Sequence, residues 1–333
     1  MTQDNPLLRR RVIDARVPRD IQIAGHTSIG AGIEFDAIRR MLERWGPNAR
    51  GVGDDAAVIP SIGDRSLVVS TDTSVENVHF RRDWLTPQEI GYRATAAALS
   101  DLAAMGTRPL GILVAMTIPD SWLSDIDGIT DGIGEAAAKN AAPVLGGDTT
   151  TGSELSLTIT VLGTVRDALT RSGARPGDFV YVTGRLGGPL AALREFQAGR
   201  TPSPENRHRF AHPVPRSQES GWLAGKGASS AIDISDGLAA DIGHLAAASK
   251  VSISVRLENV PAVEGVSATD AALSGEEYEL VVTAPSIDTV QFRERFHLDL
   301  TQIGEVAEGE AGVVITENGK PVTLAAGYLH FTE

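Results

Sequence analysis

The sequence LVVSTDT at residues 67–73 joins a short apolar run to four residues whose side chains all carry oxygen. The apolar run has the length and composition of a buried strand. An aspartate recurs beside short apolar or glycine-rich stretches in GVGDD at residues 51–55, LSD at 99–101, GGD at 146–148 and DISDG at 233–237. We therefore expect these distant parts of the chain to bring acidic side chains to one site at the ends of strands.

Aspartate and glycine are also common in turns, so a single segment of this kind would indicate only a turn. Four segments, three of which pair an aspartate with an adjacent serine, threonine or second aspartate, favour a functional site. Two like unit charges about 5 Å apart repel by roughly 3 kcal/mol at an effective dielectric constant of about 20, so such a cluster needs cations. Carboxylate and hydroxyl oxygens are hard ligands suited to Mg²⁺. The sequence thus predicts a site that holds several magnesium ions and handles an anionic substrate.

Length and composition limit the class of protein. A chain of 333 residues exceeds the size of one hydrophobic core and predicts two domains. Its 42% hydrophobic and 22% charged residues are typical of a soluble globular protein. The net charge of −13 argues against nucleic acid and anionic membranes as partners. The absence of cysteine excludes disulfides and thiolate catalysis and agrees with a cytoplasmic location. No stretch reaches the roughly 20 apolar residues of a membrane helix.

The first half of the chain alternates helical and strand patterns. Residues 34–45 have helical spacing and end at Gly46-Pro47. TPQE at residues 86–89 combines an N-cap threonine, a proline at the first helical position and a glutamate that reaches back to the cap, which predicts a helix up to Met105. Further expected elements are a strand at 110–118, a helix at 122–141 and strands at 144–145 and 155–161.

A second α/β unit follows a polar, turn-rich segment at residues 171–178. We expect a long loop with little regular structure at 199–217, because this segment contains four prolines. The predicted domains are a poorly defined extension at 1–28, a first domain at 29–167 and an α/β domain at 168–333. Expected elements of the second domain are strands at 179–183, 231–234, 251–257 and 278–283 and helices at 189–197 and 238–249.

Common nucleotide motifs are absent. Residues 51–56 match G-x-G-x-x-A, but two carboxylates would face the pyrophosphate and Pro60 interrupts the helix that should follow. Gly225-Lys226 lacks the spacing and the hydroxyl residue of a Walker loop, and the sequence contains no H-E-x-x-H. A nucleotide site in this chain must be of another kind.

Seven segments in order resemble the thiamine-monophosphate kinase family, within the superfamily that includes aminoimidazole ribonucleotide synthetase. The resemblance spans about residues 34–330. It implies an α/β (α+β) fold of two domains, with mixed sheets and helices on one side, and a homodimer formed by the amino-terminal domains. It also implies that ATP phosphorylates thiamine monophosphate to thiamine diphosphate with the help of several Mg²⁺ ions. The segments are GVGDDAAVI, VVSTDTSVENVHF, LSDLAAMGTRPLG, VLGGDTT, RSGARPGDFVYVTGRLGG, IDISDGLAADIGHL and SGEEYEL.

The resemblance also implies roles for individual residues. Gly147, Asp148, Arg171 and Ser235 would bind the nucleotide, and His79, Glu276 and Tyr328 would bind thiamine monophosphate. Asp72, Asp101 and Asp236 would be the catalytic carboxylates. The implied metal ligands are Asp55, Ser70, Thr71, Asp72, Asp101, Asp148, Asp233 and Asp236.

Two departures from the family pattern bear on the phosphoryl acceptor, thiamine monophosphate. Ala98 replaces the usual asparagine before Leu-Ser-Asp, and SGEEY at residues 274–278 replaces Gly-Gly-Glu-Asp-Tyr. Two alternatives therefore stay open at this point. One is another ATP-using synthetase of the same superfamily, and the other is a non-catalytic protein that binds nucleotide or thiamine phosphate.

Overall fold

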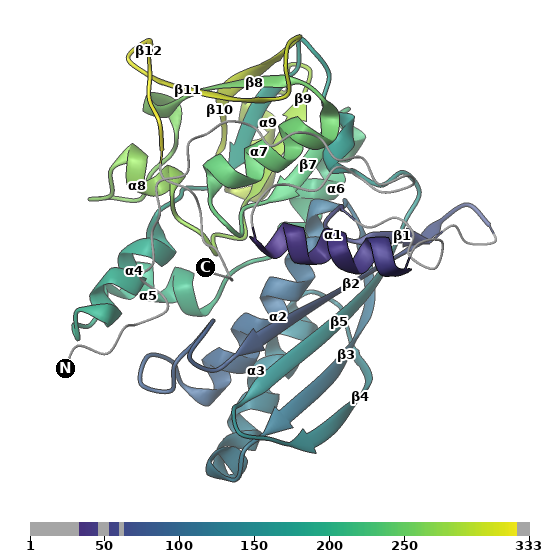
Figure 1. Ribbon diagram of the computed structural model, residues 1–333, viewed down its shortest axis with the longest axis vertical. Coiled ribbons are helices and arrows are strands. Elements are labelled where there is room, and N and C mark those ends of the chain that lie inside the picture. The colour runs from purple at the N-terminus through teal and green to yellow at the C-terminus, as the bar shows by residue number, and fades with distance from the viewer. Residues whose placement is uncertain (1–32, 46–52, 60–62, 325–333) are drawn as a thin grey trace.

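The structure is a computed structural model that describes residues 33–45, 53–59 and 63–324. It contains two sheets, the first in the lower part of Figure 1 and the second in the upper part. Helix α1 (Ile33–Trp45) precedes the first sheet and lies where the sequence predicts a helix. Within these described ranges, no helix is both long and apolar enough to cross a membrane.

The first sheet has the strand order β1-β2-β5-β3-β4. β3 and β4 are parallel, and the other neighbouring pairs are antiparallel. β5 alternates strictly between buried and half-buried residues, which confirms the predicted strand of period two. The strands are β1 (Ala57–Ile59), β2 (Ser66–Val75), β3 (Arg108–Ile118), β4 (Val144–Thr151) and β5 (Ser156–Val165).

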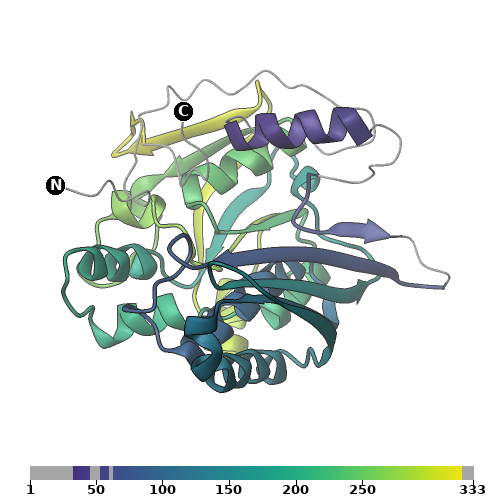
Figure 2. The same cartoon turned by 60° about the horizontal axis from the view of Figure 1, so that its bottom comes forward.

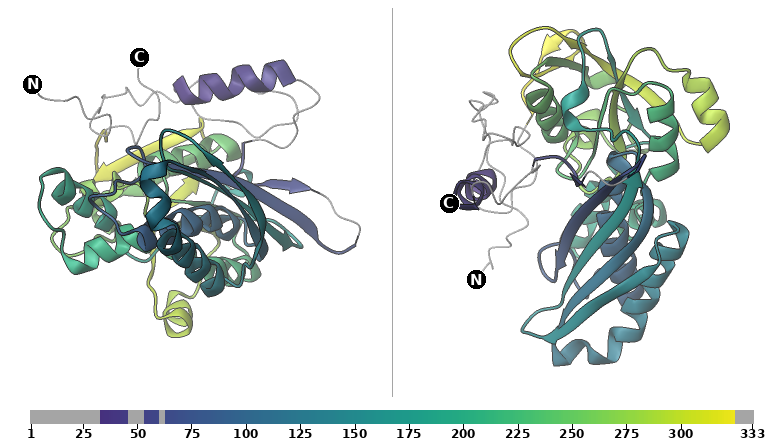
Figure 3. Two further views of the ribbon diagram at one scale, coloured as in Figure 1. Left: turned by 90° about the horizontal axis from the view of Figure 1, so that it is seen from below. Right: turned by 90° about the vertical axis from the view of Figure 1, so that its right-hand side faces the viewer.

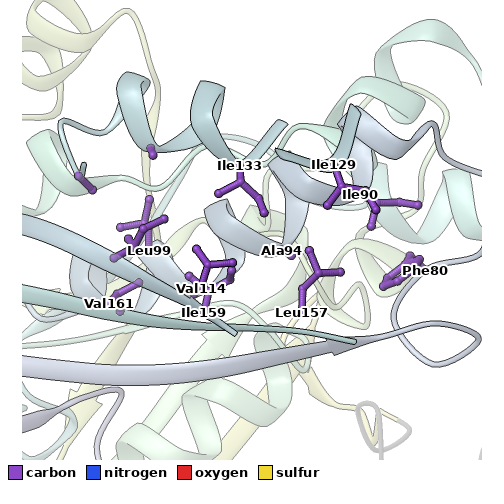
Figure 4. Close-up of a cluster of buried hydrophobic side chains, with 14 of the residues drawn as sticks. Phe80, Ile90, Ala94, Leu99, Val114, Ile129, Ile133, Leu157, Ile159 and Val161 are labelled. Carbon is purple, nitrogen blue, oxygen red and sulfur yellow. The ribbon is translucent and has the colours of Figure 1, made fainter. Parts of the chain in front are cut away.

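Helices α2 (Pro87–Ala104) and α3 (Ile126–Lys139) lie on one face of this sheet (Figure 3, right). The predicted cap of α2 is confirmed, since Thr86 and Glu89 each accept a hydrogen bond from the other's backbone N–H. Leu99 of α2 and Ile133 of α3 belong to the buried cluster against the strands in Figure 4. Residues 120–125 form a 3-10 helix, so the helix predicted at 122–141 begins later, at Ile126.

The second sheet has the order β12-β11-β8-β10-β6-β9-β7. Helix α7 (Leu238–Ser249) packs in a core with Val180 and Ile232, whereas α6 (Ser217–Gly225) and α9 (Thr289–Phe296) pack in another with Tyr181 and Val282. Helices therefore lie on one face of the first sheet but on both faces of the second. The strands are β6 (Phe179–Thr183), β7 (Ser230–Asp233), β8 (Ser252–Arg256), β9 (Leu280–Ala284), β10 (Leu300–Ala307), β11 (Gly312–Glu317) and β12 (Lys320–Pro321), and α8 is Ala268–Ala272.

The expectation of a long irregular loop at residues 199–217 is wrong. Helix α5 (Pro204–Ala211) lies inside it, beside α4 (Gly188–Gln197) in Figures 1 and 2. The Ser203 hydroxyl accepts the N–H of Asn206 and so caps the helix. Pro204 occupies the first helical position, where proline is favoured, so it starts a helix instead of preventing one. Phe210 of α5 packs in the core of the first sheet. The two halves of the chain therefore share a core.

Candidate metal and nucleotide site

Three aspartates that are distant in the sequence meet where the two sheets adjoin. Asp55 precedes β1, Asp101 lies in the last turns of α2, and Asp233 ends β7. One carboxylate oxygen from each lies within 4.8 Å of those of the other two. Asp55 and Asp233 are buried, at 7% and 3% exposure. The structure thus brings together one predicted ligand from each of three segments, and we call Asp55, Asp101 and Asp233 the aspartate cluster.

Two serines hold this cluster in place. The Ser70 hydroxyl of β2 donates to Asp101 Oδ2 at 2.6 Å, and the Ser100 hydroxyl of α2 donates to Asp233 Oδ2 at 2.6 Å. The second contact joins the first half of the chain to the second. Hydroxyl groups orient these carboxylates but bring no positive charge to the cluster.

The electrostatics of the cluster are unfavourable to three ionised carboxylates. Burial, followed by the Asp233 and Asp55 carboxylates, raises the pKa of Asp101 well above its usual range. Burial and then Asp55 raise the pKa of Asp233 to about 7. Each group is shifted because its anionic form has lost water and gained like-charged neighbours. A bound cation would stabilise the anionic forms of Asp101 and Asp233 and lower both pKa values.

Arg171 supplies a positive charge at the edge of the cluster. Its Nη2 donates to Asp55 Oδ1 at 2.5 Å, and its backbone N–H donates to Asp54 Oδ1 at 3.0 Å. Although burial opposes the effect, Asp55 raises the pKa of Arg171 further. Burial and the adjacent Asp55 carboxylate raise the pKa of Asp54 to about 6. Arg171, a predicted nucleotide ligand, and Asp55, a predicted metal ligand, are therefore in direct contact.

The residues of the aspartate cluster fit a divalent cation. All the donors are oxygen, which is the ligand type of Mg²⁺. Asp55 Oδ2 is buried and has no hydrogen-bond partner among the residues that the structure describes. A buried carboxylate oxygen without a partner is costly. A metal ion at this point would give that oxygen a partner.

Strand β2 carries the remaining first-domain ligands, but it divides them between its two faces. Ser70 and Asp72 are paired with the buried Val161 and Ile159, so they lie on the helix-covered face towards Asp101. The Asp72 carboxylate contributes to the raised pKa of Asp101. Thr71 lies on the opposite, exposed face, where its hydroxyl contacts that of Thr160 at 3.0 Å. Only Asp72 and Ser70 thus face the aspartate cluster.

Gly147 and Asp148 lie on the far edge strand. β5 and β3 separate β4 from β2, so roughly three strand spacings, about 14 Å, lie between them. Asp148 pairs with the exposed Ala115, which places its side chain on the open face and not on the helix-covered face of Asp72. Every residue of β4 is exposed. The structure therefore does not bring Gly147 and Asp148 into the aspartate cluster within one chain.

Two of the residues predicted to bind thiamine monophosphate, His79 and Glu276, contact other residues of the chain. His79 follows β2 in a turn, and its Nδ1 accepts the N–H of Val75 at 3.1 Å. Glu276 forms an ion pair with Arg93 of α2 and has a positive φ of 57°. Tyr328 lies outside the described residues. Arg93 was not predicted to have a role, and it is 4% exposed.

The segment that carries Ser235 and Asp236 has a further acidic neighbour that the sequence analysis did not single out. Asp241, in the first turn of α7, is 1% exposed. Ligand atoms of Asp236, Asp241 and His244 also lie within 4.8 Å of one another. Burial, followed by Arg171, lowers the pKa of His244 to about 3, so its imidazole is neutral at physiological pH. Spacing could have indicated this group, because residues 241 and 244 share one helix face.

Comparison with known proteins adds an independent observation. Residues 53–165 match the family model of the AIR synthase related protein N-terminal domain, and residues 175–317 match that of its C-terminal domain. The thiamine-monophosphate kinase of Escherichia coli strain K12 is 36% identical over 321 residues, which covers 90% of this chain and 98% of that protein.

Solved structures agree. A structure described as "AaThiL complexed with AMPPCP and TMP" superimposes with a TM-score of 0.78 at 29% identity, covering 90% of this chain and 97% of the other. The thiamine-monophosphate kinase of Stenotrophomonas maltophilia K279a gives a TM-score of 0.72 at 34% identity, covering 88% of this chain and 98% of the other. Hydrogenase maturation protein HypE, at 20% identity and a TM-score of 0.68, shares the fold.

Proposed function

The chain belongs to the thiamine-monophosphate kinase family of AIR synthase related proteins, and from this premise we propose that it transfers the terminal phosphoryl group of ATP to thiamine monophosphate. The observation that carries the proposal is the aspartate cluster, with three carboxylates, one unpartnered buried oxygen and Arg171 at its edge. Such a site is built to receive cations together with a polyphosphate.

The chemistry of the acceptor explains why the cluster contains carboxylates and no evident general base. A phosphate monoester has its second pKa near 6, so it is largely ionised at neutral pH and needs no proton removed. The difficulty is to bring two polyanions into line. Asp55, Asp101 and Asp233, with Asp72 and Asp236 nearby, would hold Mg²⁺, which would neutralise the phosphate charge. The chain itself orients two of these carboxylates through hydrogen bonds from the Ser70 and Ser100 hydroxyls.

Arg171 and Glu276 have separate roles in this proposal. The planar guanidinium of Arg171 suits two phosphate oxygens of the nucleotide, and its contact with Asp55 places it beside the metal site. The family resemblance assigns Glu276 to the acceptor side, where an anionic carboxylate would attract the positively charged thiazolium ring of thiamine. Arg93 fixes the direction of this carboxylate. The family resemblance adds His79 and Tyr328 to the acceptor side.

One incubation tests the function. The protein, ATP, Mg²⁺ and thiamine monophosphate should yield thiamine diphosphate and ADP in equal amounts. A synthetase of the same superfamily would instead need an amide or acid co-substrate and release inorganic phosphate, and a non-catalytic binding protein would bind ligands without turnover. Release of phosphate without thiamine diphosphate, or binding alone, would overturn the proposal.

We further propose that the protein is a homodimer in which Asp148 of one chain completes the nucleotide site of the other. Two observations support this. Within one chain, Asp148 lies on the open face of the first sheet, away from the aspartate cluster. The open face and its edge also expose large apolar side chains that a second copy would cover, namely Leu110, Leu113, Val144 and Leu145.

Mixed dimers test the second proposal. Asp101→Asn and Asp148→Asn chains are inactive alone, but a dimer of one with the other keeps one intact site if Asp148 acts across the interface. Random exchange makes half of all dimers mixed with one good site in two, so activity should recover to about a quarter of wild type. If Asp148 acts within its own chain, every site in the mixture stays defective and nothing is recovered.

We also propose a domain boundary and a cellular location. The boundary between the domains lies between residues 167 and 168, supported by the last strand of the first sheet, which ends at Val165, and the first of the second, which begins at Phe179. A cytoplasmic location is supported by the absence of cysteine.

A further inference from the structure

A single buried oxygen organises the turn after β7. Asp241 Oδ2 accepts the backbone N–H groups of Ser235, Asp236 and Gly237 at 3.1, 3.2 and 3.1 Å. Three consecutive N–H groups can point at one atom only if the chain curves tightly around it. Gly237, at φ 115°, adopts a conformation that other residues rarely take. The shape of this turn therefore depends on Asp241.

The turn is held from its other side by residues 275–278, which include Glu276. The N–H of Glu276 donates to the Ser235 carbonyl at 2.7 Å, and the N–H groups of Glu277 and Tyr278 donate to the Ile234 carbonyl at 3.0 and 2.9 Å. A Cβ atom added to Gly275 would lie 2.7 Å from the Ser235 carbonyl oxygen. The two segments thus pack backbone to backbone, with no room for a side chain between them.

Asp241 is in an unfavourable place for a carboxylate that serves stability alone. Its neighbours Asp233 and Asp236 are also acidic, and like charges at this range repel. A neutral acceptor would fold with less repulsion. A carboxylate oxygen, however, accepts several N–H groups more strongly than an amide oxygen does. The geometry of the turn, with Ser235 and Asp236 on it, is what this side chain provides.

We propose that Asp241 is a positioning residue, which holds Ser235 and Asp236 in the arrangement that binds the metal–nucleotide complex. This rests on the nucleotide part of the proposed function. Asp241 acts through the turn. Groups that orient ligands of a metal site change affinity or activity by about 10- to 100-fold when removed.

The test compares Asp241 with a matched buried carboxylate. Asp178 is 5% exposed, accepts the N–H of Arg175 at 2.9 Å and lies before β6, away from the aspartate cluster. Calorimetry measures binding of a non-hydrolysable ATP analogue with Mg²⁺ to Asp241→Ala, Asp241→Asn and Asp178→Ala. We expect Asp241→Ala to raise the dissociation constant by about 10- to 100-fold and to lower kcat by about 100-fold. Asp241→Asn, whose amide oxygen accepts N–H groups more weakly than the carboxylate, should recover part of the loss.

Asp178→Ala should lower the melting temperature and leave the dissociation constant unchanged. Equal dissociation constants for Asp241→Ala and Asp178→Ala, both measured well below their melting temperatures, overturn the inference. If Asp241→Ala does not fold, Asp241→Ser, whose hydroxyl is too short to reach three N–H groups, replaces it under the same criterion. Because analogue binding needs no acceptor, a wild-type protein that binds the analogue but leaves thiamine monophosphate unchanged refutes the proposed function and not this inference.

Discussion

Two groups of buried and half-buried acidic side chains lie close together in this protein, and the fold compensates their charges in different ways. In the segment 276–279, Glu276 pairs with Arg93, Glu277 with Arg209 and Glu279 with Arg216. In the described part of the chain, the aspartate cluster has one such pair, Arg171 with Asp55. The glutamates have their counter-charges within the fold. The aspartates, with one arginine for three carboxylates, require further positive charge from outside the chain, which a bound cation would bring.

Removing a charge should therefore have opposite consequences in the two groups. Asp101→Asn should lower turnover by at least about 1,000-fold, or about 4 kcal/mol of barrier, because a ligand of the catalytic cations is lost. The melting temperature of the metal-free protein should stay level or rise, because the substitution removes a carboxyl group whose ionisation burial and the neighbouring Asp233 make unfavourable. Steady-state kinetics and calorimetric melting measure the two effects.

Asp131→Asn, an exposed position on α3, is the control and should change neither quantity. A marked fall in the melting temperature of Asp101→Asn would show that the aspartate cluster is structural. Asp72→Asn, on the adjacent strand, should behave as Asp101→Asn does.

In the glutamate group, loss of a partner should destabilise the fold. Arg216→Met leaves Glu279 at 1% exposure without the guanidinium that donates to both its oxygens. Removing one partner of a buried ion pair costs about 3 to 5 kcal/mol, and Arg209, whose Nη2 lies 3.7 Å from Glu279 Oε1, would offset part of that loss. Urea unfolding measures the loss, and Glu279→Gln added to Arg216→Met should restore part of it.

The exposed pair Arg200–Glu195 provides the matched control. Arg200→Met should cost less than about 1 kcal/mol, since solvent already screens that pair. A loss equally small for Arg216→Met would contradict the view that the glutamates depend on their arginines.

The sequence predicts the aspartate cluster better than it predicts the arginine partners of the glutamates. Aspartates next to strand ends, with serines beside them, indicated a cluster, and the structure joins Ser70 to Asp101 and Ser100 to Asp233. The capping box of α2 was also predictable, because its signals lie within four residues. Local patterns of this kind depend on few other parts of the chain.

The rest depends on strand order and on packing between the two halves. The position of Asp148 on the open face follows from the placement of β4 at the edge of the sheet, which no local pattern contains. Arg93 meets Glu276 across 183 residues, and Phe210 of the unpredicted helix α5 packs in the core of the first half. The three arginines of the glutamate group are therefore not recognisable before the fold is known.

The pH dependence of stability tests the charge of Asp233 in the aspartate cluster. The pKa of Asp233 is about 7 in the folded, metal-free protein, against 3.8 as the ordinary value. Between these values the folded state holds a proton that the unfolded state has lost, so this group destabilises the fold as pH rises through 7. Asp233→Asn should exceed the wild type in unfolding free energy by roughly 1 to 3 kcal/mol at about pH 8, and by much less at about pH 5.

Denaturation in the presence of a chelator measures this difference at both values of pH. Saturating Mg²⁺ should remove the advantage of Asp233→Asn, because the ion stabilises only the folded state that binds it. An advantage that does not vary with pH would mean that the Asp233 carboxylate is not the origin of the repulsion.

The smallest expected effect concerns the one arginine that the aspartate cluster has. Arg171→Lys keeps the positive charge and the backbone contacts to Asp54 and Ser249, but it loses the planar fork that can bind two oxygens at once. If Arg171 binds the phosphates of the nucleotide, the Michaelis constant for ATP should rise by about tenfold, equivalent to about 1.4 kcal/mol, and that for thiamine monophosphate should change by less than about twofold. The melting temperature should hardly change, since the charge beside Asp55 remains. Equal weakening of both substrates would instead assign Arg171 to the link between the two halves of the chain, and the aspartate cluster would then have no arginine devoted to the nucleotide.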